Sequence, residues 1–488
     1  LLSRRQRQMC IRDRLGSAQD QNAWSEGNQW TINSFFSRVN YTFANKYVIE
    51  GTIRADGSSR FDPDHRWGWF PGVNAAWRVG EEGFMKRLGW FEDLKVRASY
   101  GEMGNQSGIG LYDYIQLISL SNDYYPFGTG VKGQMATSGN IISTSRTWET
   151  IQTTNVGFDF STLNNRLYGS FDYFWKENKN MLIPKTYPSM LGADAPSTNS
   201  GHLSIHGWEI SLGWRDQIKD FSYSVRFNIS DAKNKVVDRV GSNLIQLGNN
   251  ETPTGYPLNS YFGYEFDGII QNEQELEAYK SRFSEGGIPG DLSVGDAMYK
   301  DLDGDGKLSV LGDGKEGSGD VKYLGDKNPR YNFGFNLSMA WKGFDLSAFI
   351  QGVGRRTMFL EGESRCPMPE AWYQSAEYWY GKTWTPERTD AQYPAITLKD
   401  KRNYNYYVST NTKFNVAYAR LKNLQFGYTI PQTLTSKAGL QKVRVYFSGE
   451  DLFEVHNTPN GWDPEENSGS ITSYPFTRNY SFGINVVF

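Results

Sequence analysis

The sequence repeatedly alternates apolar and polar residues with a period of two, a pattern that restricts a chain to β-strands with two chemically different faces. The clearest example is a predicted hairpin formed by residues 207–214 and 221–230. Its apolar positions are Trp208, Ile210, Leu212, Trp214, Phe221, Tyr223, Val225, Phe227 and Ile229. Its polar or small positions are Glu209, Ser211, Gly213, Ser222, Ser224, Arg226 and Asn228. We therefore expect an antiparallel sheet with one apolar face and one polar face.

The alternation recurs from about residue 33 to the end of the chain and predicts about 14 strands, a number within the range of membrane β-barrels. The other predicted strands include residues 35–43, 47–55, 67–79, 93–101, 150–160, 166–176, 333–341, 344–351, 418–430 and 442–449. Several connections are tight turns, whereas those at residues 102–146, 231–259, 271–329 and 352–413 are long. This inequality is typical of a transmembrane barrel, which has short turns on one rim and long loops on the other.

Composition also favours a sheet that faces lipid. The mean hydropathy is −0.60, yet the chain contains 15 Trp, 30 Tyr and 29 Phe. A barrel explains both facts, because it exposes aromatic residues outward and keeps its interior and loops polar. No run of 18 apolar residues occurs, so we expect no transmembrane helix. The net charge of −3 argues against a basic nucleic-acid-binding surface.

Two local predictions follow from the same patterns. Residues Tyr223, Val225, Phe227 and Ile229 are expected to face lipid in an apolar band about 25 Å tall, whereas Arg226 and Asn228 face the lumen. The segment 272–283 is expected to form a short helix inside a long loop. Asn272 would cap this helix, and Glu275 stands at the spacing of a capping box.

The last residues of the chain form a predicted strand that ends on Phe488 itself. Tyr480, Phe482, Ile484 and Val486 share its apolar side with Phe488. The segment resembles the C-terminal assembly signal of outer-membrane barrels. The positions that carry this resemblance are Ser481, Gly483, Val486 and Phe488. The alternative is an ordinary edge strand at the end of a soluble sandwich.

Several motifs in order along the chain give it a wider resemblance. They include Arg54-Ala-Asp-Gly-Ser-Ser-Arg-Phe61, Leu94-Lys-Val-Arg-Ala-Ser-Tyr-Gly101, Trp148-Glu149-Thr150, Tyr418-Ala-Arg-Leu-Lys-Asn423 and Gly461-Trp-Asp-Pro-Glu465. Together they resemble the SusC/RagA family of TonB-dependent outer-membrane transporters. The resemblance implies a Gram-negative outer-membrane barrel that imports oligosaccharides or peptides. It also implies two partners, a SusD-like surface lipoprotein and the TonB complex.

The resemblance leaves the start of the chain unexplained. Residues 1–14 contain five Arg and one Asp without an apolar period, so we interpret them as non-native or disordered. Residues 15–488 would then be the C-terminal part of a receptor barrel. The resemblance implies a 22-stranded barrel with a plug domain, so about 8 strands and the plug are expected to be absent here.

The sharpest chemical motif is the acidic segment Asp301-Leu-Asp-Gly-Asp-Gly306. Carboxylates at positions 1, 3 and 5, followed by a glycine that permits a tight turn, match the start of a calcium-binding loop. The predicted Ca²⁺ ligands are Asp301, Asp303, Asp305, Lys307 through its carbonyl oxygen, Ser309 and Asp313. Asp313 would replace the acid of position 12, where this chain has Gly312. The alternative is an acidic turn that stays solvated.

A second candidate site is the aromatic segment 371–384 in a predicted extracellular loop. Flat rings can stack on sugars or hold apolar side chains of a peptide or a partner protein. The candidate contact residues for substrate or lid are Trp372, Tyr373, Tyr378, Trp379, Tyr380 and Trp384. The alternative is that these rings pack against one another inside the loop.

Other functions remain possible from the residues alone. A secreted β-rich protein that binds or hydrolyses glycans and is stiffened by calcium would also use many aromatics and carboxylates. A passive porin or an adhesin would share the barrel. Cys10 and Cys366 lie far apart, and no Ser/His/Asp, Cys/His or phosphate-loop arrangement is present, so we do not expect an enzyme.

Overall fold

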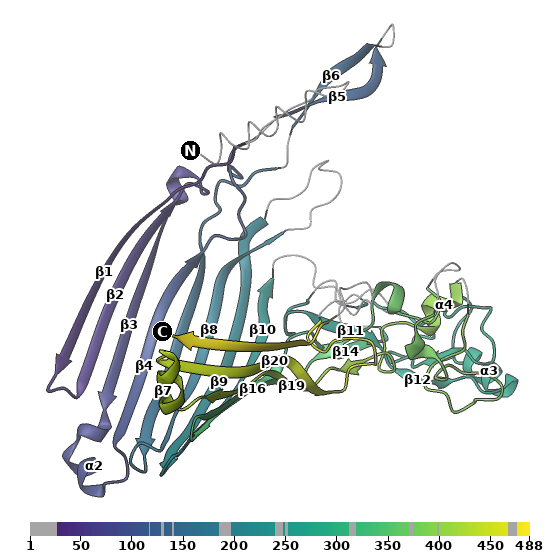
Figure 1. Ribbon diagram of the computed structural model, residues 1–488. Coiled ribbons are helices and arrows are strands. Elements are labelled where there is room, and N and C mark those ends of the chain that lie inside the picture. The colour runs from purple at the N-terminus through teal and green to yellow at the C-terminus, as the bar shows by residue number, and fades with distance from the viewer. Residues whose placement is uncertain are drawn as a thin grey trace.

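The main element of the structure is one antiparallel sheet of thirteen strands, which Figure 1 shows as a curved wall. The structure is a computed structural model that describes residues 27–116, 118–127, 131–138, 141–184, 197–239, 247–248, 252–311, 319–369, 375–397, 400–466 and 476–488. The basic segment 1–14 therefore lies outside the described residues.

Each strand of the sheet is hydrogen-bonded to the next one along the sheet order. In this order the strands are β1 (Ile32–Phe43), β2 (Tyr47–Ser58), β3 (Trp67–Arg78), β4 (Asp93–Asn105), β7 (Glu149–Thr162), β8 (Leu167–Pro184), β9 (Ser197–Ile218), β10 (Phe221–Arg239), β15 (Arg330–Trp341), β16 (Phe344–Arg355), β19 (Tyr418–Thr429), β20 (Lys442–His456) and β21 (Asn479–Val487). The antiparallel sheet predicted from the alternating sequence is confirmed.

The short connections lie together at one end of the strands, and their backbone angles explain their residues. In the turn between β7 and β8, Asn164 and Asn165 adopt φ values of 58° and 60°. Asparagine tolerates this left-handed region better than most residues do. Gly343, between β15 and β16, has a φ of 88°, and a Cβ there would stand 2.7 Å from the carbonyl oxygen of Thr429. The connections at the opposite strand ends are much longer.

The two faces of the sheet differ as the sequence predicts. On the outer face, large side chains are open to the surroundings: Phe35, Trp69 and Phe482 expose 68%, 65% and 83% of their surface. Tyr223, Val225, Phe227 and Ile229 are partly exposed, and none belongs to a buried cluster of described residues. No second protein layer within the described residues covers this face, as expected for a surface that meets lipid.

Among the described residues, the two end strands of the sheet have one neighbour each. β1 pairs with β2 in a continuous register, and β21 pairs with β20. The sequence predicted about 14 strands in the barrel wall. The structure has thirteen in this sheet and four further two-stranded sheets. One of these is the hairpin of β5 (Ile118–Phe127) and β6 (Val131–Ser138), which projects away from the wall in Figure 1.

The long connections between β10 and β15 and between β16 and β19 fold together into what we call the loop module. It lies beyond one end of the wall in Figure 1. Its strands are β11 (Ser260–Tyr264), β12 (Phe266–Ile269), β13 (Ala297–Tyr299), β14 (Val321–Asp326), β17 (Thr357–Met358) and β18 (Phe414–Asn415). Its helices are α3 (Glu273–Lys280), η4 (Gly362–Ser364), η5 (Glu377–Trp379) and α4 (Asp400–Asn405). The other helical segments in the described part of the chain are η1 (Pro63–His65), η2 (Val79–Glu81), α2 (Gly83–Leu88), α5 (Gln432–Thr435) and η6 (Ser436–Ala438).

The loop module has its own buried core, which is rich in tyrosine. The Tyr279 and Tyr404 hydroxyls are 2.7 Å apart, although the residues are 125 positions apart in sequence. The Tyr299 backbone N–H donates to the Tyr279 hydroxyl at 2.9 Å, and the Tyr299 hydroxyl donates to the Tyr404 carbonyl at 2.9 Å. These three tyrosines expose 2% or less of their surface. Hydrogen bonds to the hydroxyls allow the rings to be buried without a desolvation penalty.

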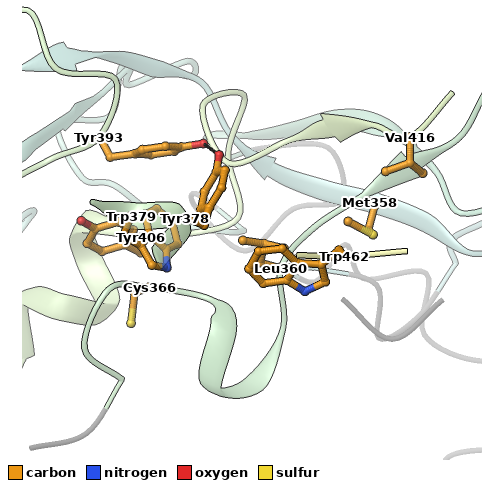
Figure 2. Packing of buried hydrophobic residues seen from close by; sticks show 9 residues of the cluster. All are labelled: Met358, Leu360, Cys366, Tyr378, Trp379, Tyr393, Tyr406, Val416 and Trp462. Carbon is orange, nitrogen blue, oxygen red and sulfur yellow. Dashed lines mark hydrogen bonds between the residues drawn. The ribbon is translucent and has the colours of Figure 1, made fainter. Parts of the chain in front are cut away.

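A second buried cluster holds the later part of the loop module. Figure 2 shows its members: Met358, Leu360, Cys366, Tyr378, Trp379, Tyr393, Tyr406, Val416 and Trp462. Trp462 belongs to the loop between β20 and β21, whereas the other members belong to the connection between β16 and β19, so this cluster joins two long connections.

The predicted loop helix is present as α3 with Asn272 as its cap, but it ends at Lys280, before the predicted end at residue 283. The Asn272 side chain accepts a hydrogen bond from the Glu275 backbone N–H at 2.9 Å, and the Glu275 carboxylate accepts one from the Gln271 backbone N–H at 2.9 Å. Its Leu276 and Tyr279 side chains point into the module core. No helix in the described part of the chain has the length and apolarity needed to cross a membrane.

Candidate functional site

The inner face of the sheet carries a network of charged side chains. Strand pairing places Arg97 of β4, Asp159 of β7 and Asp172 of β8 on this face. The Arg97 guanidinium donates to Asp172 at 2.6 Å and to Asp159 at 3.0 Å. Paired charges of this kind keep a lumen-facing surface hydrated and polar without leaving an uncompensated charge. The inner wall is thus suited to a polar passage.

A hollow of about 940 Å³ lies on the inner face of β1 to β4. Phe36 and Arg54 line it together with Asn74. Phe36 exposes 82% of its surface, so an apolar ring stands among polar groups on this wall. The volume of this hollow falls in the range of known ligand pockets, about 300–1,000 Å³.

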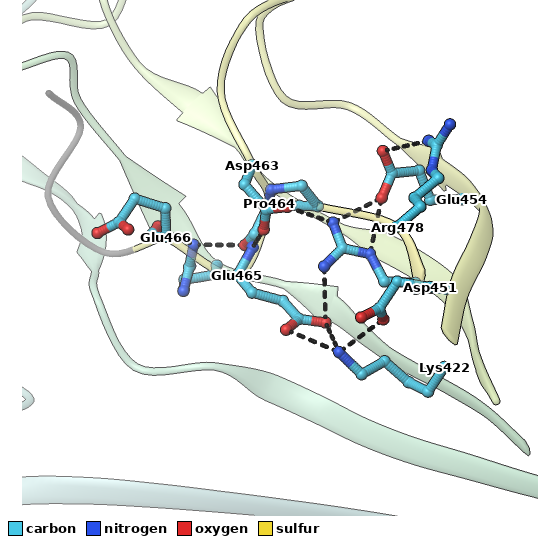
Figure 3. Close-up of polar contacts among 10 residues, drawn as sticks. Lys422, Asp451, Glu454, Asp463, Pro464, Glu465, Glu466 and Arg478 are labelled. Carbon is cyan, nitrogen blue, oxygen red and sulfur yellow. Dashed lines mark hydrogen bonds and ion pairs between the residues drawn. The ribbon is translucent and has the colours of Figure 1, made fainter. Parts of the chain in front are cut away.

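An ion-pair network fixes the loop between β20 and β21 to the strands, and Arg420 of β19 is at its centre. This guanidinium is fully buried and contacts Glu454 at 2.7 Å, Asp463 at 2.6 Å and Glu465 at 3.1 Å. Figure 3 shows these carboxylates converging from strand β20 and from the loop. Asp463 and Glu465 lie in the sequence motif 461–465, so the structure gives this motif a role in fixing the loop.

Two more cations complete this network. The Lys422 ammonium is 2.8 Å from Asp451 and 3.2 Å from Glu465. The Arg478 guanidinium lies 3.3 Å from Glu454 at the exposed margin. The nearly buried Arg356 donates to the backbone carbonyls of Pro464 and Glu466, at 2.7 and 2.9 Å. In the sequence, the motifs 418–423 and 461–465 only contributed to the family resemblance, and no contact between them was predicted.

The acidic segment forms a tight turn in the loop module, close to α3. One Asp301 carboxylate oxygen accepts from the Gly304 N–H at 2.6 Å, and the other accepts from the Gly306 N–H at 2.9 Å. Gly304 and Gly306 have φ values of 75° and 74°, a left-handed conformation that favours glycine. The Gly306 carbonyl accepts from the Ser284 N–H at 2.7 Å, which fixes the turn to the end of the α3 region.

The structure adds an unpredicted carboxylate, Asp320, to this turn. Oxygens of Asp301, Asp303 and Asp320 all lie within 4.8 Å of one another. Asp320 is fully buried, and it accepts from the backbone N–H groups of Leu302 at 2.6 Å and Ser309 at 2.8 Å. Burial, together with the charges of Asp303 and Asp301, raises the pKa of the Asp320 carboxyl. Three converging carboxylates of this kind suit a hard divalent cation.

The predicted ligand set is brought together only in part. Asp301 and Asp303 belong to the cluster, whereas Asp305 turns its carboxylate to the Lys307 backbone N–H at 2.7 Å. Ser309 reaches the site through its backbone, which is hydrogen-bonded to Asp320. Asp313 lies outside the described residues. The calcium-loop pattern could not indicate Asp320, because this residue lies beyond the local spacing that defines the motif.

Glu265 provides a pH-dependent contact in the same module. Hydrogen bonds from Lys300 and Lys322 lower its pKa from 4.5 to about 2. A carboxyl with a lowered pKa contributes stability above its unfolded value, and this contribution is lost as the pH falls through the folded value. We therefore expect the melting temperature of the module to fall between pH 4.5 and about 2. In the Glu265→Gln variant this acid-dependent loss should be smaller; an unchanged pH profile would contradict the assignment.

The loop aromatics mostly face inward. Tyr378, Trp379 and Trp384 expose 9%, 3% and 9% of their surface. The Tyr378 hydroxyl is 2.7 Å from the Tyr393 hydroxyl, and the Trp384 indole N–H donates to the Gln271 side chain at 3.0 Å. These contacts favour packing inside the loop, the alternative kept open in the sequence analysis. Trp372 and Tyr373 lie outside the described residues, so direct substrate or lid contact stays a prediction for the segment.

Tyr380 differs from its neighbours because 90% of its surface is exposed. It stands in a tight turn, in which the Lys382 N–H donates to the Trp379 carbonyl at 3.1 Å and Gly381 has a φ of 74°. Of the candidate aromatic residues that the structure describes, Tyr380 is the one free to meet an external surface.

The terminal strand has the predicted geometry. β21 ends at Val487, and Phe488 follows with 82% of its surface exposed. Gly483 faces the opposite side, where a Cβ would stand 2.4 Å from the Tyr446 ring. Ser481 pairs with Ser448, and Val486 pairs with Val443. Three residues of the predicted assembly signal thus lie on one regular edge strand, and the fourth, Phe488, follows its last residue with an exposed ring.

Comparisons with known proteins agree with this architecture. A family described as "TonB dependent receptor-like, beta-barrel" matches residues 8–452. The chain is 32% identical over 490 residues to TonB-dependent receptor P3 of Formosa agariphila, in an alignment that covers 94% of this chain and 46% of the relative. It is 27% identical over 497 residues to TonB-dependent receptor SusC of Bacteroides thetaiotaomicron. This alignment covers 96% of this chain and 45% of the relative.

The fold is also similar to a solved structure. The structure of the RagAB peptide transporter superposes with a TM-score of 0.75 at 23% identity, covering 94% of this chain and 48% of that chain. The chain thus spans about half the length of the relatives it matches. The resemblance first seen in short motifs extends over nearly the whole chain.

Proposed function

Because the chain belongs to the TonB-dependent receptor β-barrel family, we propose that the protein imports bulky nutrients across the outer membrane with energy delivered by TonB. The family consists of transporters, not enzymes, in the outer membrane of Gram-negative bacteria. The observation that carries the proposal is the two-sided wall, with exposed rings such as Phe35 outside and paired charges such as Arg97 and Asp172 inside. The alternative of a secreted glycan-hydrolysing protein is not supported by this family membership.

The proposed cargo is an oligosaccharide or a peptide, delivered with the help of a SusD-like surface lipoprotein. Support comes from the similarity to SusC and to the RagAB peptide transporter, and from the hollow on the inner wall. The loop module is the candidate contact surface for the lipoprotein, with Tyr380 as its exposed ring. Affinity capture of the protein from outer membranes should recover a surface lipoprotein. A Tyr380→Ala variant should recover less of it.

Transport is tested by uptake into cells. A strain that lacks the protein should fail to take up fluorescent oligosaccharides or peptides that the parent strain imports. Deletion of TonB should give the same loss. Uptake that continues without TonB but still requires the protein would instead indicate a passive porin and would contradict the proposal.

We further propose that Asp301, Asp303 and Asp320 bind Ca²⁺ and so stiffen the loop module. The geometry of the site supports this, because oxygens of the three carboxylates lie within 4.8 Å of one another and a divalent cation among them would compensate their charges. Ca²⁺ would be held by these carboxylates and by backbone or water oxygens. Affinity in the range of extracellular calcium modules is expected, with dissociation constants of about 10⁻⁴–10⁻³ M.

The calcium proposal predicts a change in stability. At Ca²⁺ concentrations of roughly 10–100 times the dissociation constant, binding should stabilise the module by about 1–3 kcal/mol. The Asp303→Asn variant should lose this response, because it removes one charge from the cluster but keeps the shape of the side chain. Asp305→Asn is the matched control, since that carboxylate is engaged with the Lys307 N–H. An equal Ca²⁺-dependent rise in melting temperature for Asp303→Asn would exclude the site.

We also propose that Ser481, Gly483, Val486 and Phe488 form the signal read by the barrel-assembly machinery. The regular edge strand and the exposed terminal ring support this role. Deleting Phe488 should reduce the amount of the protein in the outer membrane several-fold, measured by quantitative immunoblotting of membrane fractions. The Ca²⁺ response of the protein that does insert should be unchanged. Normal membrane levels after this deletion would leave Phe488 as a packing residue.

A further inference from the structure

The outer face of β8, β9 and β10 changes in chemistry along the strands, row by row. Paired residues in adjacent antiparallel strands point to the same face, so each row can be followed across the three strands. One row consists of Phe171, Ile210 and Ile229, and the next consists of Tyr173, Trp208 and Asp231. The following two rows consist of Trp175, His206 and Lys233, and of Glu177, Ser204 and Lys235. Along the strands this face thus changes from an apolar row to rows that contain the lysines Lys233 and Lys235.

The register places both lysines on the lipid-facing side. The pairing between β9 and β10 is continuous from Phe221 to Val236, and the first irregularity comes between Val236 and Asp238. Lys233 and Lys235 therefore share the face of Phe227 and Ile229. His206, Lys233 and Lys235 are all exposed.

Along strand β10, Lys233 and Lys235 lie where the strand is expected to reach the lipid headgroups. A tilted transmembrane strand needs about 9–11 residues to cross the hydrocarbon layer. Counted from Phe221, the first residue of β10, this span ends near Ile229 to Asp231. Trp175, which is 45% exposed, stands in the same row as Lys233, and tryptophan is enriched at the membrane interface. The long connections lie at this end of the strands, which makes it the extracellular side.

The acidic residues on this part of the face already have partners. Asp231 is buried and forms an ion pair with Arg330. Glu177 is bonded to the His202 ring at 2.6 Å and to the Ser204 hydroxyl at 2.8 Å. Within the described residues, neither Lys233 nor Lys235 forms an ion pair. The two lysines at headgroup level thus face outward, and within the described residues no carboxylate lies within ion-pair distance of either ammonium group.

From this arrangement we infer that Lys233 and Lys235, with His206 beside them, bind the phosphate groups of an outer-leaflet lipid. Cationic side chains at the level of anionic headgroups attract them, and the ammonium groups can reach outward while their stems cover apolar surface. The aromatic row directly below would contact the upper part of the acyl chains. The inference rests on the outer-membrane location and is independent of the cargo that the protein carries.

The test uses the full protein purified from outer membranes in detergent, with lipid A as the probe. Wild-type protein should bind phosphorylated lipid A, measured by native mass spectrometry and by the rise in melting temperature on addition of the lipid. The Lys233→Glu/Lys235→Glu variant should bind about tenfold more weakly. Dephosphorylated lipid A should bind weakly to both proteins. Should the charge-reversed protein fail to insert, the Lys233→Gln/Lys235→Gln variant provides the same comparison.

Lys176 of β8 provides a matched control. It follows Trp175 directly, so it stands at nearly the same height but on the inner face, where it lies over the Phe174 ring. Lys176→Glu should bind phosphorylated lipid A like the wild type. Equal binding by the double variant and the wild type would overturn the inference. Displacement of the lipid by millimolar inorganic phosphate would also overturn it, because the site would then bind phosphate and not a lipid. Loss of the surface lipoprotein from the double variant, with unchanged lipid binding, would show that this face binds a protein.

Discussion

Replacing Arg420 with methionine should destabilise the loop between β20 and β21 by about 3–5 kcal/mol, the cost of removing one partner from a buried ion pair. The buried guanidinium faces Glu454, Asp463 and Glu465, and their charges would be left close together without it. The expected readout is faster cleavage of this loop in limited proteolysis, together with a lower melting temperature.

Arg478→Met is the matched control for this prediction. Arg478 contacts the same Glu454, but its side chain is 46% exposed and the ion pair is 3.3 Å long. Exposed pairs contribute about 0–1 kcal/mol, so this variant should resist proteolysis almost as the wild type does. Equal sensitivity of the two variants would mean that burial of Arg420 has no energetic role. Arg420→Lys should recover little, because an ammonium cannot direct hydrogen bonds to three separated carboxylates at once.

Replacing Tyr299 with alanine should unfold or loosen the loop module, at a cost of about 3–5 kcal/mol typical for buried aromatic residues. Tyr299 is 1% exposed and packs near Tyr264 and Tyr404, with ring centroids 5.6 and 5.3 Å away. Hydrogen–deuterium exchange should show lost protection in both β13 and α4, which belong to different connections.

Two further variants separate packing from hydrogen bonding in this core. Tyr299→Phe keeps the ring but removes the hydroxyl that donates to the Tyr404 carbonyl, so a smaller loss of about 1–3 kcal/mol is expected. Tyr380→Ala removes an exposed ring of the same residue type from the same module and should leave the exchange protection unchanged. A protected α4 in Tyr299→Ala would show that the two connections fold independently.

The strands of the wall could be predicted from the sequence because each one carries a lipid-facing apolar side. The residues at which the strands begin and end could not be predicted in the same way. β9 runs from Ser197 to Ile218, although the alternating pattern predicted only residues 207–214. In this extension the outer face becomes polar, as with Ser204 and His202, while Leu203 lies on the other face, so the alternation no longer marks the side that faces lipid although the hydrogen bonding continues.

The loop module was not predictable as a folded unit. Its core depends on contacts between residues such as Tyr279 and Tyr404, and no local pattern connects two loops so far apart in sequence. The same limit applies to the acidic site. Asp301 and Asp303 follow a local spacing rule, whereas Asp320 reaches them through the fold of the chain. The aromatic loop was recognisable by composition, but composition does not distinguish a buried Trp379 from an exposed Tyr380.

The loop module is built from two separate connections, and this affects the order in which parts of the protein fold. Its two connections are separated in sequence by the β15–β16 hairpin, which belongs to the membrane wall. In the proposed orientation, with the long connections outside the cell, we expect Tyr279 and Tyr404 to meet only after both connections have crossed the membrane, on either side of the β15–β16 hairpin. Contacts of such long sequence separation form slowly, because the entropy of closing the intervening chain is lost first. We expect the cell-surface module to be the last part of the protein to mature, so newly inserted molecules should pass through a protease-sensitive stage.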